Sequence, residues 1–406
     1  MGAGHAHSHR ADRGDGFEVA RGPRAVLLAS VLLAAVAALV GVVALWPSSA
    51  DVDKIVDAVP FAAPGVTFPT AVIDAVADTC PRAADGSVDN SAKGCGVLEV
   101  TVHDGAGKGD KVSVQVSPQV TDSGLAPGDR VRLQRTPGAD GADPSYGYFG
   151  TERTRPFLVM GLLFALLVVV VARWRGLFAL LGLGFSGLVI WKFMLPALLL
   201  GESGLLVGLC GSAAIMVVVL YLTHGPSVRT SAALAGTLAG LAVTAGIGVV
   251  AVGVTRLTGV SDDSAGILST FAGDLSFQGL IACATIVAGL GVLNDVTITQ
   301  ASSVWEVRSA APTMSRAQVF ASGMRIGRDH IASTIYTIVF AYAGSALAVL
   351  LILQLYGVPF DVLLTTEEIG EEIVRTLASA IGLVLAVPLT TGIAALTVPG
   401  ASSLSE

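Results

Sequence analysis

Two acidic residues, Asp295 and Asp329, stand at the ends of two consecutive hydrophobic segments. Ionisable side chains in membrane spans are costly, and those that occur usually face a bundle interior or a water-filled path. Polar residues accompany each aspartate at intervals of three or four positions, so they share one face of a helix. Carboxylates and hydroxyls on such a face can bind a cation or pass a proton. The candidate residues for ion binding or transport are Asp295, Thr299, Glu306, Asp329, Ser333, Thr337, Arg325 and Arg328.

Two other interpretations explain the same aspartates. The first is helix capping at the level of the lipid headgroups, with Arg325 and Arg328 as ion-pair partners. The second is an intramembrane aspartyl protease, in which two carboxylates share a proton. Asp295 follows the sequence LGVLN rather than the contexts of such proteases, and the sequence lacks a Walker loop, a zinc-protease motif and a nucleophile elbow. We therefore expect no enzymatic activity and no resident cofactor.

Pro388 is a third feature of interest, near the middle of the last hydrophobic segment. Proline lacks a backbone N–H and clashes with the preceding turn. We predict that it interrupts the helix and frees backbone carbonyls, as in many transporter sites.

The composition is that of a polytopic membrane protein. Hydrophobic residues make up 53% of the 406 residues and charged residues 14%, against roughly 25% charged residues in soluble domains. The net charge of -7 argues against nucleic acid as a partner, since such binding needs a basic surface. The lipid bilayer is the expected environment.

The N-terminal part of the chain has two sections. Residues 1–24 are polar and rich in glycine, which predicts a disordered cytoplasmic tail. His5, His7 and His9 alternate in it and could bind a metal. We favour a solvated tail, because a flexible tail has no surrounding residues that would hydrogen-bond the imidazoles and fix their orientation. Residues 25–46 are apolar and long enough to cross a hydrocarbon core of about 30 Å. A signal peptide has a shorter apolar region of about 7 to 15 residues, so we predict a retained transmembrane anchor.

Residues 47–155 predict a small soluble domain. The stretches VLEVTVHDG, DKVSVQVS and DRVRLQR alternate apolar and polar residues between Gly and Asp turns, which indicates strands. We expect an all-β domain, either an OB-like barrel or a sandwich. Cys80 and Cys95 are a candidate disulfide that would close a loop of about 15 residues and add about 3 kcal/mol. Such a bond would place the domain outside the cytoplasm.

Seven more apolar segments follow in residues 156–398, so that we predict about eight transmembrane helices in a mainly α fold. The segments are approximately 156–172, 177–195, 204–223, 232–255, 275–293, 331–355 and 373–398. Connections rich in Lys and Arg stay in the cytoplasm. This rule places both termini, a loop over residues 294–330 and a tail over residues 399–406 inside, and the domain of residues 47–155 outside.

Two local patterns predict packing and helix boundaries. Small residues recur every four positions in one segment, at Ala232, Gly236, Gly240, Thr244 and Gly248. This spacing lets helix backbones approach closely, and we interpret it as a packing face rather than a ligand site. Ser315 and Gln318 have the spacing of a capping box and predict the start of a helix.

A set of residues around the two aspartates carries a family resemblance. It consists of Gly289, Gly291, Asp295, Ser302 or Ser303, Glu306, Ser322, Gly323, Met324, Ile326, Gly327, Arg328, Asp329, Ala341, Tyr342 and Gly344. In these positions the sequence resembles the YibE/F-like family of bacterial multispanning membrane proteins. A weaker resemblance covers the GDRV sequence at 128–131 and the junction YGYFGTERTRP, where Glu152 and its neighbours depart from the expected aspartate and aromatic residue before Arg153. The resemblance implies a protein of the bacterial cytoplasmic membrane with an extracytoplasmic N-terminal domain and a suspected role in transport or export.

These observations favour a secondary transporter or export component for an ion or small solute, in which Asp295 and Asp329 handle a proton or cation. The alternative is a non-transporting membrane scaffold or envelope-assembly factor that binds a partner through residues 47–155. The expected partners are lipid, an unknown small solute or ion and, in the alternative, an envelope protein. A homo-oligomer is compatible with both.

Overall fold

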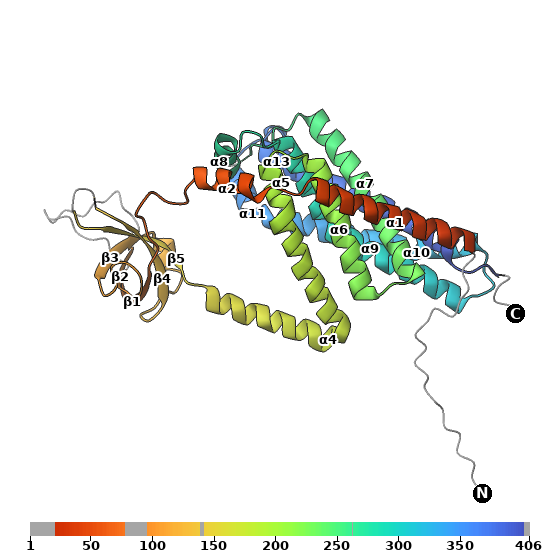
Figure 1. Ribbon diagram of the computed structural model, residues 1–406, viewed down its shortest axis with the longest axis horizontal. Helices are drawn as coiled ribbons and strands as arrows, with labels where there is room; N and C mark the ends of the chain where they lie inside the picture. Colours follow the sequence, from red (N-terminus) through yellow and green to blue (C-terminus); the bar gives the residue numbers. More distant parts are fainter. Residues whose placement is uncertain (1–20, 78–95, 139–141, 262, 402–406) are drawn as a thin grey trace, which may run out of the picture. The chain divides into compact units, whose positions relative to one another are not determined.

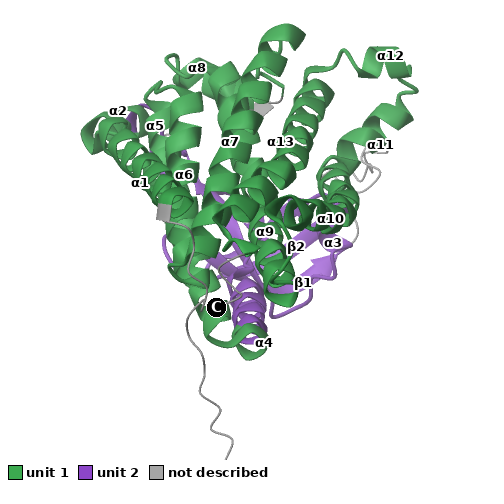
Figure 2. Cartoon of the chain, turned by 90° about the vertical axis from the view of Figure 1, so that its right-hand side faces the viewer, with its two compact units in different colours: residues 1–56, 169–406 green, residues 57–168 purple. Residues whose placement is uncertain are grey.

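The computed structural model describes residues 21–77, 96–138, 142–261 and 263–401. The chain divides into two compact units, residues 57–168 in one and residues 1–56 with 169–406 in the other, purple and green in Figure 2. The histidine tract His5, His7 and His9 and the cysteine pair Cys80 and Cys95 lie outside the described residues. The candidate residues of the hydrophobic segments all lie within them.

The unit of residues 57–168 contains one antiparallel sheet of five strands in the order β3-β2-β1-β4-β5. Its elements are β1 (Thr70–Ala77), β2 (Gly96–Val102), β3 (Lys111–Val116), the short helix α3 (Pro118–Thr121), β4 (Arg130–Thr136) and β5 (Ser145–Thr151). Alternate side chains of a strand point to the same face of the sheet, and Leu98, Val100 and Val102 of β2 are all buried on one face, where they form part of a hydrophobic core. Strand β3 also lies against β5, which makes the sheet a nearly closed barrel. The predicted small β domain is confirmed in its barrel form.

The remaining elements are helical (Figure 1). They are α1 (Arg21–Ala44), α2 (Ser49–Ala58), α4 (Thr154–Val189), the π-helix η2 (Ile190–Met194), α5 (Leu195–Leu199), α6 (Gly204–His224), α7 (Val228–Thr255), α8 (Asp263–Phe271), α9 (Phe277–Ala310), α10 (Arg316–Ser345), α11 (Leu347–Leu355), α12 (Phe360–Leu363) and α13 (Glu367–Thr397). The long helices form where the sequence has uninterrupted apolar runs, since a helix satisfies its own backbone hydrogen bonds.

The number of candidate membrane spans differs from the prediction. Among the described residues, six helices are long and apolar enough to cross a membrane, or seven if the bent pair α10 and α11 is one span. Two predicted spans fall within one helical stretch of 46 residues, Thr154–Leu199, in which the backbone of Arg173 is non-helical (φ 56°, ψ −135°). The predicted span 331–355 is bent by 61° between α10 and α11. Hydropathy measures the length of an apolar segment, whereas the ends and bends of a helix depend on local backbone angles. The structure therefore does not reproduce the eight separate helices that hydropathy predicts.

Helices α7, α9 and α13 pack against one another in the core of the helical unit. The small-residue ladder of α7 lies in this contact, and all five of its members are buried. A Cβ atom on Gly240 would lie 2.8 Å from Cδ2 of Leu293 on α9 and 2.9 Å from Cβ of Ala386 on α13. The ladder is therefore a packing face, as its spacing predicts.

Candidate functional site

The two predicted polar ladders lie on the exposed faces of α9 and α10. Their exposed members are Asp295, Thr299, Glu306, Asp329, Ser333 and Thr337. Within the described residues, no hydrogen bond or ion pair joins Asp295 to Asp329. Both ladders keep the single helical face that their spacing predicts, but neither enters the interior of the bundle formed by one chain.

Asp295 has a neighbour that the sequence analysis did not select, the imidazole of His330. Nε2 of His330 on α10 lies 4.0 Å from Oδ2 of Asp295 on α9, so the two form an ion pair when the histidine is protonated. The Asp295 side chain is 72% exposed and the His330 side chain 28%. Nε2 of His330 and Oδ1 of Asn294 are buried and have no hydrogen-bond partner in the part of the chain that the structure describes. The available signal for His330 was its position directly after Asp329.

Neither aspartate caps a helix. Asp295 lies well inside α9, which continues to Ala310, and Asp329 lies well inside α10, which begins at Arg316. The segment 294–330, expected as a loop between spans, is helical except at residues 311–315. The capping box that starts α10 is present, with the side chain of Ser315 accepting from the backbone of Gln318 and the reverse bond also formed. The capping interpretation of the aspartates is therefore wrong, because the apolar runs end before the helices do.

Arg325 and Arg328 do not act as partners of the aspartates. Both side chains are exposed, and Nη2 of Arg325 donates to Oγ of Ser322 on the same helix at 2.8 Å. In the described part of the chain, neither arginine forms an ion pair with Asp295 or Asp329. The exposed side chains of Arg328 and Asp329 are accessible to solvent, ions or another molecule.

A buried polar row lies on another side of α9 and was missed from the sequence. Nε2 of Gln300 donates to the carbonyl oxygen of Gly323 on α10 at 2.8 Å and to Oγ1 of Thr391 on α13 at 2.7 Å. The hydroxyls of Thr297 on α9 and Thr237 on α7 lie 2.6 Å apart. The spacing of Thr297 and Gln300, three residues apart, was the signal for a polar face. These bonds connect four helices, and the row serves to hold the bundle together.

Pro388 does not interrupt α13, which is helical from Glu367 to Thr397. The proline ring removes one backbone donor, so the carbonyl of Val384 loses its usual helical partner. One turn later, Oγ1 of Thr391 donates to the carbonyl of Val387 at 2.6 Å. Packing of α13 against α7, α9 and α10 holds the helix together through the proline. The predicted break is thus corrected to a continuous helix.

Metal-ligating side chains do not gather within the described ranges, where no three or more His, Cys, Asp or Glu residues are placed to hold a metal ion. Cys210 and Cys283, the cysteines of the apolar segments, are free thiols.

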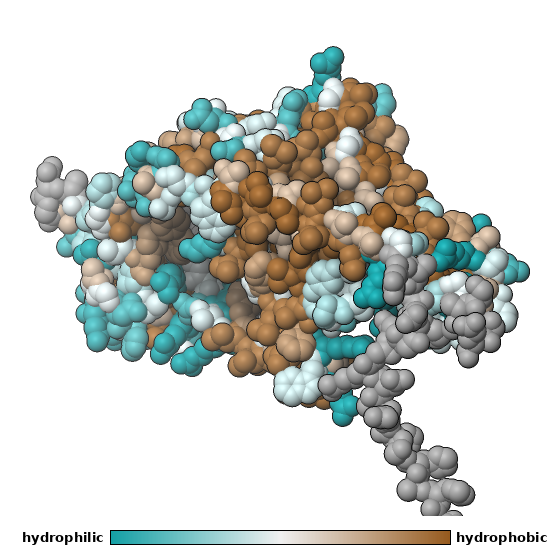
Figure 3. Space-filling model, turned by 45° about the vertical axis from the view of Figure 1, so that its right-hand side comes forward, coloured by the Kyte–Doolittle hydropathy of each residue, from teal (hydrophilic) through white to brown (hydrophobic). Residues whose placement is uncertain are grey.

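The outer surface of the helices is apolar, as the brown areas of Figure 3 show on one face. Leu33, Val171 and Phe340 are 71%, 80% and 71% exposed. Soluble monomers rarely expose contiguous apolar patches larger than a few hundred Å². Together with the long apolar helices, this surface defines a multi-pass membrane protein.

Residues 160–400 match the family model of the YibE/F-like protein, and the chain belongs to this family. The match extends from within α4 to just beyond α13 and includes Asp295 and His330. It confirms the resemblance seen around the two aspartates. Searches of the curated proteins and of the solved structures found no match.

Proposed function

We propose that this YibE/F-like protein transports or exports an ion or small solute, and that Asp295 and His330 take up and release a proton or cation. The observation that carries the proposal is the 4.0 Å separation of Oδ2 of Asp295 and Nε2 of His330 on two consecutive helices. Chains of carboxylate and imidazole side chains form the proton relays of membrane pumps and transporters. Asp329 supplies a second carboxylate next to the histidine in the chain.

The depth of Asp295 along α9 supports this role. From Phe277 to Asp295 the helix rises about 27 Å, close to the thickness of a hydrocarbon core of about 30 Å. A charge at the centre of a bilayer costs at least about 2.5–3.5 kcal/mol, whereas one at its boundary is hydrated. We infer that Asp295 and His330 stand at the mouth of a path, with Thr299 and Glu306 on the water side and Ser333 and Thr337 along α10.

The test is proton movement in proteoliposomes that contain the full chain and a trapped pH-sensitive dye. A panel of Na⁺, K⁺, Mg²⁺ and Ca²⁺ salts is added outside, and the internal pH is followed. We expect wild-type protein to move protons with at least one cation, and Asp295→Asn and His330→Gln to lose this response. Asp361→Asn, an exposed acid of α12, is the control. Unchanged proton flux in both variants would overturn the proposal.

We also propose eight membrane crossings with both termini in the cytoplasm of a bacterial cell. The stretch Thr154–Leu199 has 46 residues and a length of about 69 Å, more than twice a hydrocarbon core. The non-helical backbone of Arg173 lies inside this stretch and supports two crossings. A reporter fused after Gly225 should then be cytoplasmic. An external reporter at this position, with the β unit also external, would mean a single crossing and contradict the count.

One observation favours the scaffold or envelope-assembly alternative. Phe61, Phe68 and Phe149 form an aromatic cluster on the β unit, with ring centroids 5.2 Å apart for Phe61 and Phe68 and 4.8 Å apart for Phe68 and Phe149. Phe61 is 80% exposed. Exposed aromatic clusters are typical of binding surfaces for other proteins, including further copies of a chain. Loss of a cross-linked envelope partner in Phe61→Ser, with unchanged function in Asp295→Asn, would favour this alternative.

A further inference from the structure

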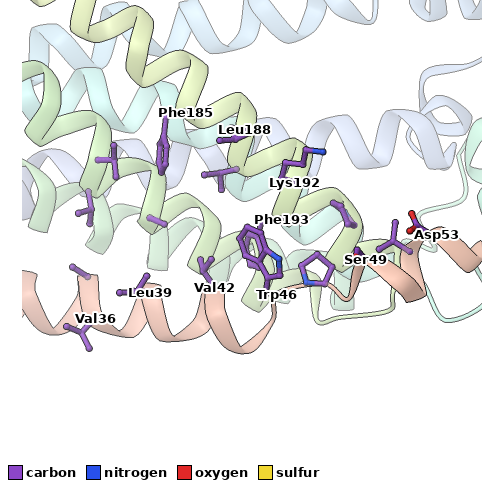
Figure 4. A pocket seen from close by; sticks show the side chains of 18 residues that line it. Val36, Leu39, Val42, Trp46, Ser49, Asp53, Phe185, Leu188, Lys192 and Phe193 are labelled. Atoms are coloured by element: carbon purple, nitrogen blue, oxygen red, sulfur yellow. The ribbon is translucent and has the colours of Figure 1, made fainter. Parts of the chain in front are cut away.

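A groove of about 940 Å³ lies between α1 on one side and α4, η2 and α6 on the other. Figure 4 shows side chains from these helices converging on it. Its walls are apolar and include Val36 and Leu39 of α1, Phe185 and Leu188 of α4, and Val217 of α6. The volume is at the upper end of the range of about 300–1,000 Å³ typical of ligand pockets. The groove therefore has room for a sizeable apolar molecule.

The polar groups of the groove lie at one end. Lys192 of η2, with Ser49 and Asp53 of α2, contributes to the lining there, whereas Val36 lies at the other end (Figure 4). Among the described residues, neither Lys192 nor Asp53 forms an ion pair. The groove is thus amphipathic, with one positive and one negative group at the same end and an apolar trough behind them.

The length of the groove corresponds to one leaflet of a membrane. Eight residues separate Val36 from Ala44 at the end of α1, a rise of about 12 Å, and Trp46 follows shortly after the helix, so the groove covers nearly half of a hydrocarbon core of about 30 Å. Trp46 stacks on Phe193 with ring centroids 5.8 Å apart and lies at the polar end. Tryptophan is enriched at the membrane–water interface, which places Lys192 and Asp53 at the level of the lipid headgroups.

The position of Lys192 on an unusual turn is a separate indication of a site. It is the central residue of the π-helix η2, in which Phe193 and Met194 are buried while Lys192 is exposed. Single π-helical turns are rare and occur frequently at functional sites. Lys192 thus interrupts an apolar stretch of sequence at the π-helical turn between α4 and α5.

We propose that this groove binds a phospholipid of the adjacent leaflet, preferentially one with a phosphoethanolamine headgroup. The phosphate is held by the Lys192 ammonium, the headgroup ammonium by the Asp53 carboxylate, and the acyl chains lie along α1. A phosphoglycerol headgroup has no cation for Asp53, and a phosphocholine headgroup has no N–H to donate to it. This site is independent of the transport proposal, because it uses different helices.

The experiment measures quenching of Trp46 by brominated lipids in the full chain. Trp174, Trp191 and Trp305 are replaced by Phe, and the protein is reconstituted in phosphatidylcholine with equal fractions of brominated phosphatidylethanolamine, phosphatidylglycerol or phosphatidylcholine. We expect the strongest quenching with phosphatidylethanolamine. Lys192→Gln and Asp53→Asn should each weaken this preference by about fivefold, the effect of one charged contact at a membrane surface.

Two further variants keep the test decisive. Arg256→Gln removes a cation that does not line the groove and should leave the lipid preference unchanged. Ala214→Phe fills the groove from α6 without changing a charge and should lower quenching by all brominated lipids. Equal quenching by the three headgroups, a preference for phosphatidylglycerol, or no effect of both Lys192→Gln and Asp53→Asn would overturn the proposal.

Discussion

Oγ1 of Thr391 on α13 accepts a hydrogen bond from Nε2 of Gln300 on α9 at 2.7 Å, and both side chains are buried. The same amide nitrogen also donates to the carbonyl of Gly323 on α10. One side chain thereby joins three helices, while Asp295, on the same helix α9, is exposed. The helical unit separates the polar groups that hold the helices together from the exposed carboxylate and imidazole of the candidate site.

Replacing Gln300 by Leu should destabilise the helical unit. The carbonyl of Gly323 and the hydroxyl of Thr391 lose their donor, and interhelical hydrogen bonds in membranes contribute about 0.6–2 kcal/mol. Unfolding of the full chain by SDS in mixed micelles measures the loss. Thr299→Val, a change at an exposed position of the same helix, is the control and should alter the free energy of unfolding by less than about 0.5 kcal/mol. Equal losses in both variants would contradict the assigned role of Gln300.

Substituting Ala for Gly240 should destabilise the packing of α7 against α9 and α13. The added Cβ would lie 2.8 Å from Leu293 and 2.9 Å from Ala386, and overpacking of this kind costs about 1–3 kcal/mol. Gly246 lies on the same helix with nothing within 4 Å of such an atom. Gly246→Ala should therefore be neutral or stabilising, by up to about 1 kcal/mol of helix propensity. The same mixed-micelle unfolding compares the pair, and a Gly240→Ala protein as stable as Gly246→Ala would refute the packing face.

Glu152 should make the β unit sensitive to acid. The hydroxyl of Thr154 donates to its carboxylate, Nη2 of Arg132 lies 2.9 Å from Oε2, and together these lower the pKa of Glu152 from 4.5 to about 2. A lowered folded-state pKa means that the stabilisation is present above about pH 4.5 and is lost as the pH falls towards about 2. In the full chain, Glu152→Gln should reduce the fall in the melting temperature of the β unit across this interval, measured by tyrosine circular dichroism. Glu99→Gln, at an exposed acid on β2, is the control for the loss of one charge, and an unchanged acid response in Glu152→Gln would exclude the contribution.

Cys80 and Cys95 should be joined by a disulfide if the β unit is extracytoplasmic. Peptide mapping without reductant should then find the two cysteines in one cross-linked species, while Cys210 and Cys283, which are free, react with an alkylating reagent after denaturation. Loss of the bond in Cys80→Ser should destabilise the unit by about 3 kcal/mol. Alkylation of all four cysteines in protein isolated from membranes would contradict both the bond and the compartment.

The sequence alone determined the elements that depend on local composition. Alternation in VLEVTVHDG predicted β2 and its buried side chains, since successive residues of a strand point to opposite faces. Four-residue spacing from Ala232 to Gly248 predicted the packing face of α7, and Ser315 with Gln318 predicted the start of α10. Residues around Asp295 and Asp329 were sufficient to indicate the YibE/F-like family.

Only the tertiary structure decided which helical face is buried and which residues meet across helices. On α9, the polar face that contains Asp295 is exposed and the polar face that contains Gln300 is buried, although both have helical spacing. The packing of α9 against α7 and α13 determines which of the two faces is buried. The neighbour of Asp295 proved to be His330 rather than Arg325 or Arg328. The course of α13 through Pro388 and the break at Arg173 likewise depend on backbone angles and on contacts with distant residues. Hydropathy and residue spacing are properties of a single segment. The buried faces, the contacts between residues of different helices and the course of each helix depend on how several segments pack together.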